Sequence, residues 1–259
     1  KIFKDSNSIC DVEIIVELLD QFCTYKYDQY VSACCILLSI CVNTLILNSK
    51  SYKLKNILER IIFTKKIESW FHGNDILRII QSLNMNLVPY VFGKNGFSMI
   101  ISVLLSFSLN KNEKFANNSI EEIIKIATSS NIEKIQRKII EKIDFFDSYS
   151  LQINLHILTS LNQKIKTKNQ IGLSFFISSI IEISSFYFDD IKTMTSIFGF
   201  LSTINSKYID IKSLSNLIDL SSKIIKIGIQ VLAGKPKKNN NQEFMILFKN
   251  MYIWKWGIL

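Results

Sequence analysis

Apolar residues recur along most of the chain at the three- and four-residue spacing that places them on one face of a helix. Several of these apolar stretches end in a similar phrase, in which a small polar residue precedes Leu or Ile and then Asn: Ser82-Leu83-Asn84, Ser108-Leu109-Asn110, Ser160-Leu161-Asn162 and Thr203-Ile204-Asn205. Asn tolerates the left-handed conformation that ends many helices, and Ser, Thr and Asn favour the turn that follows. The pattern therefore predicts helices separated by short polar turns.

The spacing predicts about a dozen helices and no convincing strand. They are expected over residues 10–22, 29–47, 54–62, 74–84, 97–109, 119–129, 132–143, 148–161, 172–185, 189–204, 213–228 and 243–252.

Three polar clusters are expected to begin helices. Asn74 or Asp75 is predicted to be an N-cap, and Ser119 with Glu122 has the spacing of a capping box. The pair Asp189-Asp190 could bind a cation or act as paired acids, but the favoured interpretation is that these carboxylates complement a helix dipole.

The breaks between helices carry little Gly or Pro, with eight Gly and two Pro in 259 residues. This scarcity favours helices joined by Asn, Ser and Lys over turn-rich sheets. The strongest break is at Pro89 and Gly93-Lys94-Asn95-Gly96. The intervals from Asn48 to Asn84 and from Asn162 to Asn205 both fit a two-helix repeat, and Asn110 falls out of register. We therefore predict an all-α fold, a degenerate α-solenoid of paired antiparallel helices.

Composition divides this predicted array into three parts. Residues 1–92 form an apolar N-terminal helical segment that contains all five Cys, residues 93–233 form the helical-repeat array, and residues 234–259 form a basic loop followed by an aromatic docking tail.

The sequence indicates no enzyme, cofactor or metal. Gly93-Lys94 and Gly234-Lys235 lack the spacing of a phosphate-binding loop. His72 and His156 stand apart from Cys and carboxylate clusters, so neither is expected to be catalytic or a ligand. The Cys residues form no C-x-x-C pair, which favours a reduced compartment.

The uncharged run Val31 to Leu47 raises the question of a membrane span, and the mean hydropathy of the chain is +0.21. Seventeen residues lie at the short end of what a bilayer requires, and the run contains Ser32, Ser39, Asn43 and Thr44. A buried helix of the array is the favoured interpretation, with a single span as the alternative.

The formal charge of +9 favours an anionic partner. Nearly all of it comes from Lys, which neutralises phosphate without the planar fork used to read bases. We therefore predict sequence-independent contact with RNA, or else an ordinary solubilising surface. The candidate RNA-binding residues are Lys164, Lys166, Lys168, Lys235, Lys237 and Lys238.

Lysines alternate with aromatic residues near the C-terminus. The aromatic residues are Phe248, Tyr252, Trp254 and Trp256. Such a segment could stack on exposed bases, or it could be a hydrophobic element that closes the array or docks on a neighbouring subunit. Docking on a partner protein is the prediction.

The phrases FSLNKNEKF (107–115), TSLNQKIKT (159–167) and STINSKYID (202–210) resemble the octotricopeptide and heptatricopeptide class of organellar helical repeats. The Ile-, Lys- and Asn-rich composition is similar to that of apicomplexan proteins. The resemblance implies an α-solenoid that binds RNA in the mitochondrial matrix, with rRNA of the mitochondrial ribosome as an expected partner. The chain lacks the RAP module common in that class.

The expected function is thus that of a non-catalytic structural component of a mitochondrial ribonucleoprotein, in contact with RNA and with neighbouring proteins. Two alternatives stay open: a protein-only scaffold of the HEAT or armadillo type in the cytoplasm, and a single-span subunit of a membrane complex.

Overall fold

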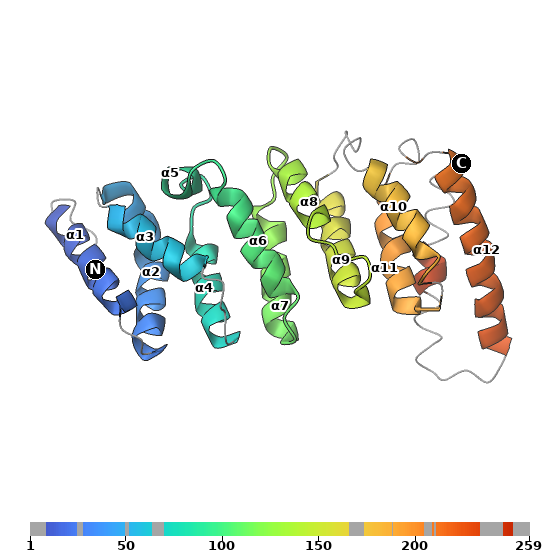
Figure 1. Ribbon diagram of the computed structural model, residues 1–259, viewed down its shortest axis with the longest axis horizontal. Coiled ribbons are helices and arrows are strands. Elements are labelled where there is room, and N and C mark those ends of the chain that lie inside the picture. Colours follow the sequence, from blue (N-terminus) through green and yellow to red (C-terminus); the bar gives the residue numbers. More distant parts are fainter. Residues whose placement is uncertain are drawn as a thin grey trace. The chain divides into compact units, whose positions relative to one another are not determined.

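The computed structural model describes residues 9–24, 28–49, 52–63, 70–165, 174–187, 189–204, 209, 211–233 and 246–250. These residues form an all-α structure in which no strand is present, as predicted (Figure 1). The helices are α1 (Ile9–Thr24), α2 (Asp28–Asn48), α3 (Tyr52–Ile62), α4 (Trp70–Ser82), α5 (Val88–Phe92), α6 (Gly96–Ser108), α7 (Glu113–Ile126), α8 (Ile132–Ile140), α9 (Ser148–Lys164), α10 (Ser174–Ser184), α11 (Ile191–Leu201) and α12 (Ile211–Ala233). A further helical segment covers residues 246–250.

Two of the predicted N-caps are wrong because their helices begin earlier. Helix α4 starts at Trp70, so Asn74 and Asp75 lie inside it. Helix α7 starts at Glu113, so Ser119 and Glu122 cannot form a capping box. The Ser119 hydroxyl instead donates to the Phe115 carbonyl at 2.9 Å. The periodicity identified these helices, but Gly73 before Asn74 and the polar pair Asn117-Asn118 before Ser119 look like turns in the sequence, although both lie inside helices.

Other predicted helix boundaries are confirmed. Asp190 caps α11, because its Oδ1 accepts hydrogen bonds from the backbone N–H groups of Lys192 and Thr193, each at 3.1 Å. Gly93 has a φ of 68°, so the predicted break places Gly where the left-handed region requires it. The neighbouring Pro89 lies in the first turn of the short helix α5, which the sequence did not predict.

The recurrent Asn has more than one structural role. Asn84 and Asn110 follow helix ends, but neither is left-handed, since the described residues include no non-Gly residue with positive φ. Their Oδ1 atoms accept from the N–H groups two residues later, at 3.0 Å for Asn84 and 2.9 Å for Asn110. Asn162 instead lies inside α9 and is buried. The fourth Asn, Asn205, lies outside the described residues.

The chain divides into two compact units, residues 1–126 and 127–259. In the first unit, α2 packs on α4 and α4 on α7, while α1 packs on α3, α3 on α5 and α5 on α6. Pairwise contacts such as α1 with α2 and α6 with α7 join these two layers. The division of the chain at residues 92 and 233 stays a prediction. The arrangement of the helices in one continuous solenoid stays a prediction as well.

The second unit repeats this arrangement. Helix α9 packs on α11 in one layer, α10 packs on α12 in the other, and α8 with α9 and α10 with α11 join the layers. In both units, a helix therefore contacts the helix two places further along the chain, as expected for stacked helix pairs.

Polar side chains reinforce these contacts at a separation of about forty residues, the length of a two-helix repeat. In the first unit, the Asn43 carboxamide donates to the Ser82 carbonyl at 2.7 Å and accepts from the Asn84 N–H at 2.8 Å, which satisfies backbone groups where α4 ends. In the second unit, Gln152 Nε2 donates to Thr193 Oγ1 at 2.8 Å, joining α9 to α11.

Helix α2, which contains the whole run Val31 to Leu47, is a core helix of the first unit. Cys34, Leu38, Cys41 and Leu45 are each no more than 2% exposed. Their burial follows from contacts with α1, α3 and α4. Among the described residues, no helix has the length and apolar character needed to cross a membrane.

We expect the Cys41 thiol to be unreactive in the folded protein. Burial raises its pKa from 9.0 to about 11, although a hydrogen bond to backbone lowers it slightly. Site-resolved mass spectrometry after maleimide treatment at mildly alkaline pH should show labelling of Cys41 only when denaturant is present. The same shift should lower stability as pH rises from 9.0 towards 11, because the unfolded thiol loses its proton first. Rapid labelling of Cys41 under native conditions would contradict its placement in the core.

Asn162 should be a stability determinant of the second unit. Its Oδ1 accepts from Gln136 Nε2 at 2.8 Å, and its Nδ2 donates to Thr203 Oγ1 at 2.9 Å. Asn162→Ala would leave the buried Gln136 amide without this acceptor, which should cost about 1–3 kcal/mol in urea unfolding. The exposed neighbour Gln163→Ala is the matched control and should leave the midpoint nearly unchanged. Equal effects of the two substitutions would show that the bridge contributes nothing specific.

Candidate binding surfaces

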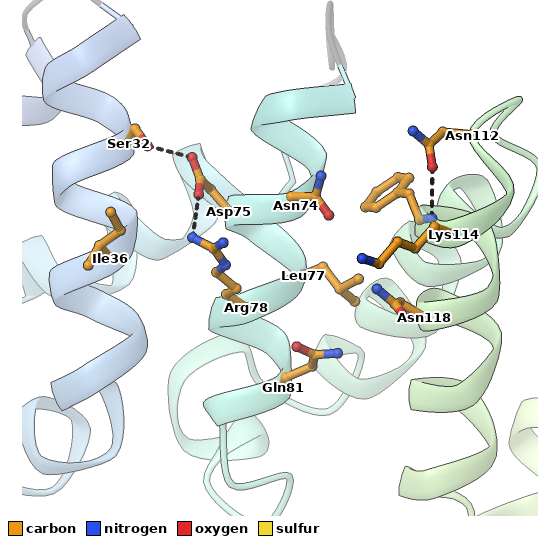
Figure 2. A pocket seen from close by; sticks show the side chains of 11 residues that line it. Ser32, Ile36, Asn74, Asp75, Leu77, Arg78, Gln81, Asn112, Lys114 and Asn118 are labelled. Atoms are coloured by element: carbon orange, nitrogen blue, oxygen red, sulfur yellow. Dashed lines mark hydrogen bonds and ion pairs between the residues drawn. The ribbon is translucent and has the colours of Figure 1, made fainter.

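A groove of about 620 Å³ lies on the first unit, between α2, α4 and α7 (Figure 2). It follows the layer of helices that contact one another about forty residues apart. Its apolar lining residues are Ile36, Leu77 and Phe115. Its polar lining residues are Ser32, Asn74, Asp75, Arg78, Gln81, Asn112, Lys114 and Asn118. We call this feature the α2–α4–α7 groove.

A buried carboxylate organises the α2 side of the groove. Asp75 Oδ2 accepts a hydrogen bond from the Ser32 hydroxyl of α2 at 2.8 Å, and Asp75 Oδ1 lies 3.5 Å from Arg78 Nη1. The Asp75 side chain is 6% exposed and the Arg78 side chain 60% exposed. Asp75 therefore positions a guanidinium whose remaining N–H donors are open to solvent or to an anionic ligand.

Carboxamides and a second cation line the rest of the groove. Asn74 and Gln81 lie on α4, and Asn118 lies on α7 across from them (Figure 2). The exposed Lys114 side chain extends from α7 towards α4, close to Asn118. Asn112 has a structural role, because its Oδ1 accepts from the Phe115 N–H at 3.1 Å at the start of α7.

The close approach of α4 and α7 depends on Gly73. A Cβ atom at this position would lie 2.7 Å from Cζ of Phe115, whose buried ring also packs on Phe107 with centroids 5.0 Å apart. The absence of a side chain at Gly73 therefore sets how near Phe115 and the beginning of α7 come to α4.

The structure describes one of the six lysines predicted to bind RNA. The exposed Lys164 donates from Nζ to the Ala127 carbonyl at 3.1 Å, so it has a structural contact within the second unit. The other five candidates, Lys166, Lys168, Lys235, Lys237 and Lys238, lie outside the described residues. The sequence could not reveal the Lys164 contact, because Ala127 is 37 residues away.

The predicted docking tail is described only at residues 246–250. Phe248 is half-buried, and Tyr252, Trp254 and Trp256 lie outside the described residues. The neighbouring Leu247 is 1% exposed, and Asn250 Nδ2 donates to the Thr195 carbonyl of α11 at 3.2 Å. This part of the tail therefore packs on the chain itself, with Asn250 bonded to α11.

Titratable groups gather near Tyr187 in the second unit. Burial raises the pKa of its hydroxyl, and the carboxylates of Asp144, Asp147 and Asp190 raise it further. The Tyr187 hydroxyl donates to the Phe145 carbonyl at 2.5 Å. Its role is therefore that of a protonated donor joining two turns.

Metal-ligand residues do not cluster in the part of the chain that the structure describes. No group of three or more His, Cys, Asp or Glu residues there could hold a metal ion. His156 is exposed on α9.

Sequence reasoning missed the α2–α4–α7 groove, although part of its signal was present. Asn74, Arg78 and Gln81 recur at intervals of four and three, so they share one face of α4. A polar stripe of this kind is also what any solvated helix face shows. That Asn118 and Lys114 of α7 lie opposite this stripe is a tertiary fact.

Comparisons with known proteins add little to the description of this groove. The sequence matches no protein-family model. It also matches no curated protein. Among solved structures, the crystal structure of an engineered protein is similar with a TM-score of 0.45 and 15% sequence identity, over 93% of this chain and 98% of that chain.

Gly73→Ala should destabilise the first unit. The new Cβ would collide with the Phe115 ring, and relief of such overpacking costs about 1–3 kcal/mol. Gly199→Ala in α11 is the matched control: its Cβ would meet Asn250 Nδ2 at 3.4 Å, an ordinary contact. Because Ala is the better helix former by about 1 kcal/mol, the control should be neutral or stabilising in urea unfolding. A Gly73→Ala protein as stable as its control would contradict the described packing of α4 on α7.

Proposed function

We propose that this chain is a non-catalytic α-helical repeat protein that binds RNA and neighbouring proteins as a structural component of a mitochondrial ribonucleoprotein, with the mitochondrial ribosome as the first candidate. The observation that carries the proposal is the distribution of charge. Residues 127–259 contain 17 of the 31 Lys and Arg residues and 10 of the 22 Asp and Glu residues. The net positive charge thus belongs mostly to the second unit, as expected of a phosphate-binding region.

The surface of α12 supports this assignment. Lys212, Lys223 and Lys226 are exposed on this helix, and the acidic residue in it is Asp219. Such lysines neutralise phosphates as point charges and do not read base edges in the planar, bidentate manner of Arg. The proposed RNA contact is accordingly independent of sequence.

The mitochondrial and ribosomal parts of the proposal have a separate basis. They derive from the resemblance of the three helix-ending phrases to organellar repeat proteins and from the Ile-, Lys- and Asn-rich composition. The RNA partner would then be rRNA.

The α2–α4–α7 groove favours a second candidate function, that of a protein-only scaffold of the HEAT or armadillo type. Residues 1–126 contain 14 basic and 12 acidic residues, so the unit that bears this groove has little excess charge for binding RNA. The two candidates differ in whether RNA binds at all.

The RNA proposal predicts a salt-dependent affinity that falls when lysines of the second unit are removed. Two triple variants, K164Q/K166Q/K168Q and K235Q/K237Q/K238Q, should each bind a labelled single-stranded RNA more weakly than wild type. The slope of log affinity against log salt should flatten by about 0.7 for every phosphate that a variant no longer neutralises. Fluorescence anisotropy over a potassium chloride series measures both quantities.

The triple variant K55Q/K94Q/K111Q removes the same charge from exposed positions of the first unit and should retain the wild-type slope. If all three variants lose affinity equally, the binding is a general effect of net charge. If the wild-type chain shows no salt-dependent binding, the protein-only scaffold becomes the better account.

A further inference from the structure

We propose that the α2–α4–α7 groove binds an extended, acidic segment of a partner protein. This inference rests on the proposed function in one respect, namely that the chain is a binding scaffold, and it names the chemistry of one partner. The groove's volume of about 620 Å³ is in the usual range for ligand sites. Because its lining comes from three helices that follow one another in a layer, it suits a linear segment better than a compact ligand.

The carboxamides of the groove match a peptide backbone. Gln81 on α4 and Asn118 on α7 each present an oxygen acceptor and an NH₂ donor. An extended peptide carries unpaired N–H and C=O groups on both of its edges, and each needs a partner when it leaves water. Carboxamides on opposite sides of the groove (Figure 2) can therefore pair with both edges of one peptide.

The charges of the groove favour acidic side chains in that peptide. The single carboxylate of the lining, Asp75, is buried and engaged by Ser32 and Arg78. The two cations, Arg78 and Lys114, are exposed, so the surface that a ligand meets is positive. A guanidinium oriented by a buried carboxylate is well suited to a bidentate contact with a second carboxylate.

The same features argue against RNA at this groove. A single strand bound without sequence preference needs aromatic faces for stacking and a continuous line of cations. Phe115, the aromatic residue of the lining, is 2% exposed and has no accessible face. Two cations on a nearly charge-balanced unit also neutralise few phosphates.

The test uses the full chain and a short fluorescein-labelled peptide in which Glu alternates with Ser or Thr. Wild type should bind this peptide more tightly than the matched peptide with Gln in place of Glu. The variant R78Q/K114Q should bind the Glu peptide about tenfold more weakly or worse, as expected when charge-assisted hydrogen bonds are removed. Fluorescence anisotropy measures each affinity, and far-UV circular dichroism verifies that each variant is folded.

Two further variants sharpen the test. R60Q/K94Q removes the same charge from exposed positions of the first unit outside the groove, and it should bind the Glu peptide like wild type. Lys114→Glu leaves the Asp75–Arg78 pair intact and should repel the Glu peptide more than the Gln peptide. If R78Q/K114Q does not fold, the Lys114→Glu variant replaces it in the binding experiment.

Three outcomes would overturn the inference: no preference of wild type for the Glu peptide, an equal loss of affinity in R60Q/K94Q, or displacement of the peptide from the groove by a uridine oligonucleotide. Peptide binding can fail while the lysine variants of the second unit still weaken RNA binding. That result rejects the peptide site and leaves the proposed RNA-binding function in place. Failure of both experiments rejects both proposed partners, the RNA and the acidic segment.

Discussion

The structure depends on the burial of apolar faces between helices that are neighbours in space but about forty residues apart in sequence. A single amphipathic helix cannot bury its own apolar face, so each helix pair requires the next one. In the first unit this requirement joins α2 to α4 and α4 to α7, and in the second it joins α9 to α11. Within such a layer, a change at one contact alters the spacing of the helices beside it, as Gly73 and Phe115 illustrate.

Polar side chains add specificity to this apolar packing. Asn43 bonds to the backbone where α4 ends, and Asn162 bridges Gln136 and Thr203. A buried carboxamide is costly when its partners are absent, so these residues favour one register of the helices over others. At the helix ends, Asn84 and Asn110 have another role, because each accepts a hydrogen bond from the N–H group two residues later without adopting the left-handed conformation.

The same layer that builds the core of the first unit leaves a polar face available for binding. Ser32, Asp75 and Arg78 form a connected group on α2 and α4, in which the carboxylate is buried and the guanidinium exposed. The second unit instead concentrates positive charge, with Lys212, Lys223 and Lys226 exposed on α12. The two units thus present different chemistry on similar helical frameworks, which is why we assign them different partners.

The correct and incorrect predictions have a common physical origin. Helices such as α3, α6 and α11 were predictable because their apolar residues follow the helical period, which depends on neighbouring residues alone. The capping box at Ser119 was wrong because a cap depends on where the backbone hydrogen bonds begin, and the polar turn before Ser119 is itself helical. The short helix α5 was missed because five residues carry too little periodicity to be recognised.

By itself, the sequence determined that the described part of this chain is helical and where most of its helices lie, since these properties come from local spacing and turn chemistry. It also determined the imbalance of charge between residues 1–126 and 127–259. Tertiary structure alone decided that Lys164 contacts the Ala127 carbonyl and that Leu247 is buried. It alone placed Lys114 and Asn118 across from Arg78. These facts depend on how distant segments pack, and that packing is a sum of many weak contacts that no local pattern encodes.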